Sequence, residues 1–150
     1  MRNTLIRWFR RHRWITLILA GMLILRGLQI GVAFYESPDI TSTLKTLDLA
    51  RQRQDAELAY AQVLPPEHGG HISRTYVQTM IDSNWRYFYE LYECTKVRHI
   101  EIGPIRTAEG VTLVAVVEVE TCFQTTDART IRSKVVLIKW HGRWLISEFR

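Results

Sequence analysis

The chain has 150 residues, which is enough for one membrane anchor and one domain of about 110 residues. Its formal net charge of +5 comes from the N-terminal tail, because residues 1–13 hold five arginines and no acid. From Glu36 onward, 14 Lys and Arg face 15 Asp and Glu, so the domain is close to neutral. A neutral domain argues against nucleic-acid binding, which needs basic charge on the domain surface.

An apolar stretch from Trp14 to Tyr35 follows this tail. As a helix it would be about 33 Å long, enough to cross a hydrocarbon core of about 30 Å. The sequence therefore predicts a basic cytoplasmic tail over 1–13, a single transmembrane helix over 14–35 and a linker with Pro38 over 36–40. The positive-inside rule places the domain outside an inner (cell) membrane, in a periplasm. A eukaryotic organelle membrane fits the same pattern.

Two other interpretations compete with the anchor. A cleaved signal peptide has the same charge order, and Gly31-Val32-Ala33 is an acceptable small-residue cleavage site that would release a secreted soluble domain. The apolar stretch is long for such a signal, which favours the anchor. Arg10-Arg11 suggests a twin-arginine signal, but the surrounding residues fit that signal poorly.

Arg26 interrupts the apolar stretch, nearer to its outer end than to its inner end. Charged side chains inside a membrane are rare without a partner. Arg26 is therefore predicted either to contact an acidic group or a carbonyl of a neighbouring membrane helix, or to snorkel towards the outer interface.

Two helices are expected next. Thr41-Ser42-Thr43 offers N-cap hydroxyls for a helix that runs to about Leu64 and ends at Pro65-Pro66. A second helix is expected from about Ser73 to Tyr92. Its apolar residues recur at three- and four-residue steps, which is typical of an amphipathic helix; they are Val77, Ile81, Trp85, Phe88 and Leu91.

The periodicity changes from helical to extended after Thr95. Strands are expected over 97–105, 111–123, 130–140 and 143–149, and His141-Gly142 is expected to form a tight hairpin between the last two. In the second strand, valines alternate with Glu118 and Glu120, which predicts a sheet with one apolar and one solvent-facing side. Helices followed by antiparallel strands predict an α+β domain over 41–150, with two or three helices on a curled sheet of about four strands.

The end of the chain, Val135 to Ile146, carries a strand, the turn His141-Gly142, and then Trp144 and Leu145. It resembles the nuclear-transport-factor-two-like (cystatin-like, cone-shaped) superfamily, many members of which close in this way. The layout of tail, single span and outer domain looks like bitopic members of that superfamily. These include the inner-membrane scaffold proteins of type IV secretion and conjugation machines. This resemblance implies a fold and an assembly role, and it carries no catalytic signature.

Cys94 and Cys122 are the two cysteines of the chain. If the first two strands form a hairpin centred near Ala108-Glu109, these cysteines face one another or nearly so. An even number of cysteines outside the membrane favours a disulfide between them, although two separate buried thiols are the alternative.

Other candidate sites receive a structural interpretation. Glu67, His68 and His71 lie on a Gly-containing loop and lack the further ligand that a metal site needs, so no metal or cofactor is predicted. Enzymes of the cone fold use an acid or His near a Tyr, and the chain offers such residues without a pattern that brings them together; they are Asp82, His99, Glu101, Glu118, Glu120, Tyr76, Tyr87, Tyr89 and Tyr92.

The aromatic density around the second helix exceeds what one buried stripe needs. Aromatic residues outside that stripe suit a protein partner; the candidates are Trp85, Tyr87, Tyr89 and Tyr92. The sequence thus predicts a non-catalytic scaffold or assembly subunit of a multi-protein envelope complex. Its expected partners are the membrane, other membrane-complex subunits and further copies of the chain in a homo-oligomer. The alternative is a tethered or secreted cone domain that binds a small ligand or has weak lyase- or isomerase-type activity.

Overall fold

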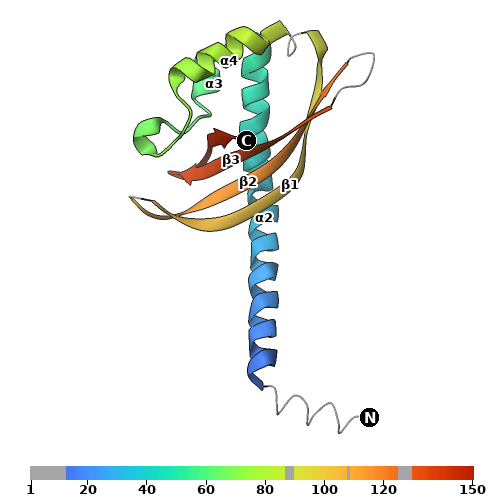
Figure 1. Ribbon diagram of the computed structural model, residues 1–150, viewed down its shortest axis with the longest axis vertical. Coiled ribbons are helices and arrows are strands. Elements are labelled where there is room, and N and C mark those ends of the chain that lie inside the picture. Colours follow the sequence, from blue (N-terminus) through green and yellow to red (C-terminus); the bar gives the residue numbers. More distant parts are fainter. Residues whose placement is uncertain (1–12, 87–89, 108, 125–129) are drawn as a thin grey trace.

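The computed structural model describes residues 13–86, 90–107, 109–124 and 130–150. Three α-helices and a four-stranded antiparallel sheet confirm the predicted α+β class. The sheet curls around the upper part of a long N-terminal helix, and two shorter helices lie at its far end (Figure 1).

The long helix, α2 (Arg13–Arg53), contains 41 residues and belongs to two environments. Its lower half is apolar and exposed, and it is the part of the described chain that is long and apolar enough to cross a membrane. Its upper half turns one side into the domain core, where Ile40, Leu44, Leu47 and Ala50 are buried.

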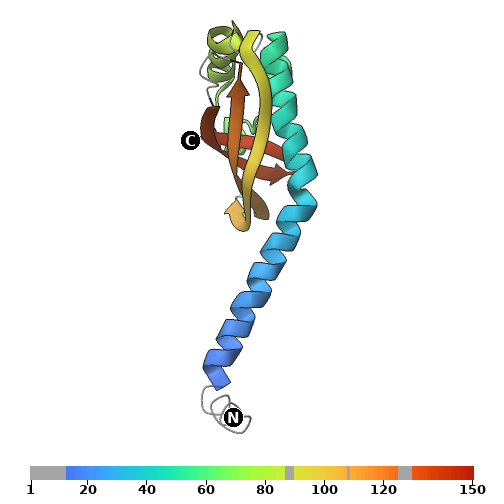
Figure 2. The same cartoon turned by 90° about the vertical axis from the view of Figure 1, so that its right-hand side faces the viewer.

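The predicted linker over 36–40 is helical, so that prediction was wrong. Pro38 lacks the N–H that would bond to the carbonyl of Phe34, and proline commonly bends a helix at this point. Figure 2 shows the axis of α2 changing direction near its meeting with the sheet. The helix continues because Glu36 and Ile40, on either side of Pro38, are held by contacts with the domain.

The helix that was expected to run to Leu64 is interrupted. α2 ends at Arg53, Gln54 adopts a left-handed backbone with φ of 55°, and Asp55 caps the short helix α3 (Ala56–Tyr60). The Asp55 carboxylate accepts a hydrogen bond from the Leu58 N–H at 2.9 Å. Aspartate favours such capping positions over helix interiors because its side chain bonds nearby backbone groups.

A 3₁₀ turn, η1 (Pro66–His68), and helix α4 (Arg74–Arg86) follow. The hydroxyl of Ser73 accepts a hydrogen bond from the Tyr76 N–H and caps α4. Val77 and Ile81 are buried as their spacing predicted. Phe88 lies outside the described residues.

The sheet has the order β1 (Tyr92–Thr107), β2 (Gly110–Phe123), β3 (Thr130–Trp140) and β4 (Arg143–Phe149). The bounds of β3 and β4 are the predicted ones, whereas β1 is longer. His141 and Gly142 have φ of 46° and 81°, as a tight two-residue hairpin requires, so the predicted turn is confirmed.

One continuous core fills the space between the helices and the inner face of the sheet. Its most buried large side chains include Leu47, Ile81, Leu137 and Ile146. Burial of each such side chain contributes about 1.5–3 kcal/mol to the free energy of folding. On the far edge of the sheet, the Leu64 N–H donates to the Ile146 carbonyl at 2.8 Å, so the segment after α3 covers β4.

Candidate functional site

The first polar site lies where α2 leaves its exposed half. Glu36 is only 5% exposed; its Oε1 accepts a hydrogen bond from Lys139 Nζ at 2.5 Å, and its Oε2 accepts one from Trp144 Nε1 at 2.8 Å. About two helical turns further along, Thr43 Oγ1 donates to the Trp144 carbonyl at 3.1 Å. These four residues, which we call the junction clamp, fasten α2 to the β3–β4 hairpin.

Electrostatics favour the charged form of Glu36. Burial alone would raise the pKa of this carboxyl, but the hydrogen bonds from Lys139 and Trp144 and the charge of Lys139 outweigh burial, and the pKa is lowered. The junction clamp therefore holds an ionised carboxylate at neutral pH.

A second polar site lies inside the curled sheet, and we call it the cone cluster: Asp48, Arg51 and Tyr92. Arg51 Nη1 lies 3.2 Å from Asp48 Oδ1, and the Tyr92 hydroxyl donates to Asp48 Oδ2 at 3.4 Å. Arg51 also contacts Met80 Sδ through Nη2 at 3.1 Å, and its guanidinium carbon lies 5.7 Å from the centre of the Phe149 ring.

Burial dominates the ionisation of the cone cluster. It raises the pKa of Asp48, although bonds from Thr95, Arg51 and Tyr92 oppose this rise. Burial also lowers the pKa of Arg51, and burial together with the Asp48 charge raises the pKa of Tyr92. The cluster is thus an ion pair held in a place that disfavours charge.

A cavity of about 40 Å³ adjoins the cone cluster. Its polar lining comes from Asp48, Arg51, Thr95, Thr121 and Ser133. This volume accommodates ordered water, for which about 10–15 Å³ is sufficient, and is far below the roughly 300–1,000 Å³ of a small-molecule site. This cavity can hold water beside an acid and is itself too small for an organic substrate.

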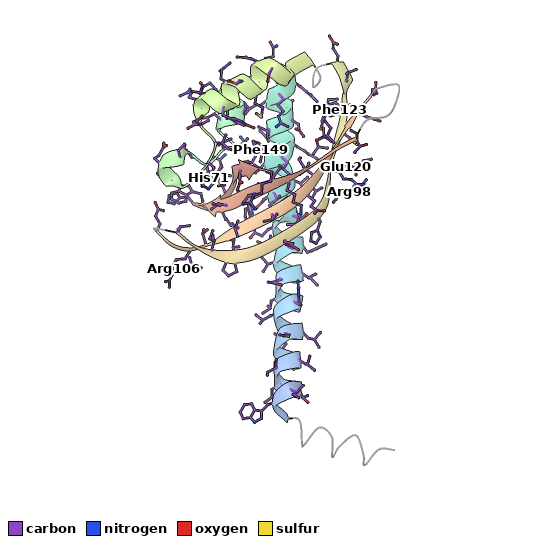
Figure 3. The ribbon with its side chains drawn as sticks, in the orientation of Figure 1. His71, Arg98, Arg106, Glu120, Phe123 and Phe149 are labelled. Atoms are coloured by element: carbon purple, nitrogen blue, oxygen red, sulfur yellow. The ribbon has the colours of Figure 1, made fainter. Side chains whose placement is uncertain are left out.

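The outer face of the sheet carries a larger depression of about 520 Å³, which we call the outer hollow. Apolar side chains form its floor: Val114, Val116, Val136, Ile138 and Trp140. Acidic, basic and imidazole side chains form its rim; these include Arg106, Glu109, His71, Glu148 and Arg150. In Figure 3, Arg106 lies at the tip of the β1–β2 hairpin and His71 on the loop before α4.

The other end of the outer face is charged. Glu120 Oε1 pairs with Arg98 Nη2 at 2.5 Å and Glu120 Oε2 with Arg132 Nε at 3.4 Å, as Figure 3 indicates for Arg98 and Glu120. The hydrogen bond from Arg98 is the main reason why the pKa of Glu120 is lowered. Glu120 was expected to face solvent, but it is only 6% exposed because the two arginines cover it; Glu118 is exposed as expected.

The predicted hairpin register is confirmed, because Cys94 pairs with Cys122 across β1 and β2. The predicted disulfide is wrong: both residues are free cysteines. Facing positions are insufficient, since a disulfide also needs the sulfur atoms about 2 Å apart in a narrow dihedral range, and the strand is irregular between Tyr92 and Cys94. A hydrogen bond involving the Cys94 thiol raises the pKa of Cys122.

Among the candidate catalytic residues that the structure describes, Tyr92 belongs to the cone cluster, whereas the candidate acids and His99 lie away from it. His99 Nε2 lies 3.3 Å from Glu101 Oε1 on the surface, and Asp82 accepts hydrogen bonds from Gln78 on α4. Tyr76 is 52% exposed. None of these side chains lines the cone cavity.

The loop histidines have separate surroundings. The His68 ring packs on Trp140 with ring centres 4.9 Å apart, and His71 lines the outer hollow. Within the described ranges, no group of three or more His, Cys, Asp or Glu is placed to hold a metal ion.

The four aromatic residues predicted to contact a protein partner lie in different places. Tyr92 is half-buried and belongs to the cone cluster. Trp85 lies near the end of α4, in a stretch whose side chains are outside the described set, and Tyr87 and Tyr89 lie outside the described residues. Their role as partner contacts, and that of Arg26 as a membrane contact, stays a prediction.

Sequence reasoning missed both buried polar sites. A local signal existed for the cone cluster, because Asp48 precedes Arg51 by three residues, a spacing that brings side chains together on a helix. For Glu36 there was no local signal, because its partners Lys139 and Trp144 are more than 100 residues away.

No protein-family model matches this sequence, and neither does any curated protein sequence. Among solved structures, the chain is similar to a protein from Xanthomonas campestris described as a calcium/calmodulin-dependent protein kinase II association domain. The TM-score is 0.49 at 11% identity, over 74% of this chain and 82% of that chain. These comparisons assign the chain to no family.

Proposed function

We propose that this chain is a single-pass membrane protein whose outer domain is a non-catalytic assembly subunit of a larger envelope complex. The observation that carries the proposal is the continuity of α2, which runs for 41 residues from the candidate span into the domain core. A secretion or conjugation machine is the kind of complex that the sequence resemblance implies, with the domain in the periplasm.

A continuous helix gives the domain a fixed orientation to the membrane. The junction clamp adds a partly buried ion pair and a buried hydrogen bond from Trp144 where a tether would otherwise be flexible. An enzyme that acts on a diffusing substrate gains little from this restriction. A subunit that must present one face to neighbouring subunits gains affinity from it, because its orientation is already fixed and need not be ordered on binding.

The outer hollow is the surface that suits a protein partner best. Its apolar floor and charged rim follow the usual anatomy of an interface, in which an apolar centre is surrounded by polar groups. A volume of about 520 Å³ accepts one or two large side chains as anchors.

Affinity purification of the full-length chain from its native membrane in mild detergent tests the proposal. We expect stoichiometric partner subunits, a second copy of the chain among them, in the eluate by intact mass. Val116→Lys, which places a charge on the half-buried floor of the outer hollow, should remove those partners. Ile131→Lys is the matched control, because Ile131 is 57% exposed on β3 and lies outside the hollow.

A chain that elutes alone, or a Val116→Lys variant that keeps every partner, would contradict this assignment. Turnover by the isolated chain that His99→Ala or Asp82→Ala abolishes would contradict its non-catalytic character.

The second candidate is a tethered cone domain that binds a small ligand or acts as a weak lyase or isomerase. The observation in its favour is the polar lining of the cone cavity, where burial raises the pKa of Asp48. The volume of about 40 Å³ limits any occupant to water or a similarly small molecule.

A further inference from the structure

A second groove lies beside the outer hollow, with which it shares Val114 and Val116, and we call it the edge groove. It measures about 900 Å³ and runs between the outer part of α2 and the edge of β1. The helix contributes one face at three- and four-residue steps: Arg26, Gln29, Ile30, Ala33, Phe34 and Ser37. The opposite wall is residues 97–103 of β1, together with Val114 and Val116 of β2.

The edge groove crosses the expected membrane boundary. At 1.5 Å per residue, Arg26 lies about 14 Å below Tyr35, where the candidate span ends, and Ser37 lies just above it. The lower part of the groove is therefore at acyl-chain depth, and its upper part is at the depth of lipid headgroups. Leu23 and Leu19, further down α2, are 74% and 54% exposed and continue the groove as an apolar surface.

The polar groups of the groove favour an anion. Arg26 is exposed, and within the part of the chain that the structure describes no ion pair of this residue occurs. The β1 wall adds Arg98, whose side chain remains 53% exposed while it bonds Glu120, and His99. The acid of the wall, Glu101, lies 3.3 Å from His99. An arginine at acyl-chain depth needs a counter-ion, and a phosphate above it supplies one.

We propose that the edge groove binds one anionic phospholipid. Its headgroup phosphate lies between Arg26 and the β1 edge, and its acyl chains follow the exposed apolar side of α2 below Arg26. This inference rests on the proposed membrane anchoring of α2. It explains why polar residues, Arg26 and Gln29, are on the side of the span that faces the domain.

Native mass spectrometry of the detergent-solubilised full chain, titrated with phosphatidylglycerol or phosphatidylcholine, tests the site. We expect the chain to prefer phosphatidylglycerol and Arg26→Leu to lose about tenfold in that affinity, because a charge-assisted hydrogen bond is worth roughly 1.5–3 kcal/mol. Gln29→Leu should show a smaller loss. Arg53→Leu is the control, since Arg53 is an exposed arginine of the same helix about 40 Å away.

Alkaline extraction of membranes separates failure of this site from failure of the anchor. Leucine favours insertion, so Arg26→Leu should stay in the membrane fraction. If the variants stay there but Arg26→Leu binds phosphatidylglycerol as the natural chain does, the lipid site is wrong and the anchor stands. Equal losses in Arg26→Leu and Arg53→Leu, or no preference for phosphatidylglycerol, would also overturn the site. Release of the natural chain by alkali would overturn the anchor itself.

Discussion

Glu36 and Asp48 are two carboxylates on the same helix, each 5% exposed, and their pKa values shift in opposite directions. Glu36 accepts bonds of 2.5 and 2.8 Å from Lys139 and Trp144. Asp48 accepts longer ones of 3.2 and 3.4 Å from Arg51 and Tyr92. Asp48 lies deep among packed atoms, where desolvation prevails over its hydrogen bonds, whereas at Glu36 the bonds from Lys139 and Trp144 and the Lys139 charge outweigh burial.

The comparison also separates two roles. The junction clamp joins distant segments and stabilises one geometry of α2 against the sheet. The cone cluster is an ion pair within one helix that is held at the cost of desolvation. Breaking each site in turn distinguishes the two roles.

The largest effect is expected at the cone cluster. Asp48→Ala leaves the Arg51 guanidinium buried without its carboxylate and should lower the free energy of unfolding by about 3 kcal/mol. The double variant Asp48→Leu with Arg51→Met should lie within about 1 kcal/mol of the natural chain, because the uncompensated charge is gone. Chemical denaturation of the full chain in detergent measures both; a double variant as unstable as Asp48→Ala would refute the desolvation argument.

A somewhat smaller loss is expected at the junction clamp. Glu36→Ala should cost about 2 kcal/mol, since it removes the acceptor of both Lys139 and Trp144, and Lys139 keeps partial access to water. Glu36→Gln should cost less because its amide oxygen still accepts one bond. Glu57→Ala, which breaks the exposed pair with Arg74, is the control and should show no measurable change in the same denaturation assay. Equal losses at Glu36 and Glu57 would show that the clamp is not stabilising.

The smallest effect is in the pH dependence of unfolding. The raised pKa of Asp48 makes the folded state take up a proton first as the pH falls from neutral, so stability should rise through that window. The lowered pKa of Glu36 acts oppositely: its contribution is present above its ordinary pKa of 4.5 and is lost as the pH falls through the lower folded value.

Thermal unfolding measured from neutral to acidic pH should therefore pass through a maximum. Asp48→Asn should remove the initial rise in unfolding temperature and leave the fall at more acidic pH. Glu36→Gln should weaken the fall only in part, because the pKa values of Glu120 and Glu148 are lowered as well. A monotonic loss of stability from neutral pH in the natural chain would contradict the assigned direction for Asp48.

Local rules predicted the sheet well and the helices less well. His141-Gly142 defined the last hairpin because the turn demands positive φ at both positions, and the hairpin centre near Glu109 predicted the facing of Cys94 and Cys122. Strand alternation also placed Val117 and Val119 in the core. These features depend on neighbours in the chain, which a single sequence shows directly.

Two of the failures involve partners distant in sequence. Pro38 indicates a linker locally, yet contacts of Glu36 with Lys139 and Trp144 keep the helix intact. Glu120 alternates with valines like a solvent-facing residue, but Arg98 and Arg132 cover it. Side-chain contacts of this kind follow from tertiary packing and are invisible to periodicity.

The central claim is that α2 passes from the membrane into the domain without a flexible joint. Double electron–electron resonance between spin labels at Leu25→Cys and Leu49→Cys tests it in lipid nanodiscs, with Cys94 and Cys122 replaced by serine. Both labelled positions are exposed, on either side of Pro38. A continuous helix predicts one narrow distribution near about 36 Å, at 1.5 Å per residue. A broad distribution that extends well below this distance would show a flexible linker and contradict the account.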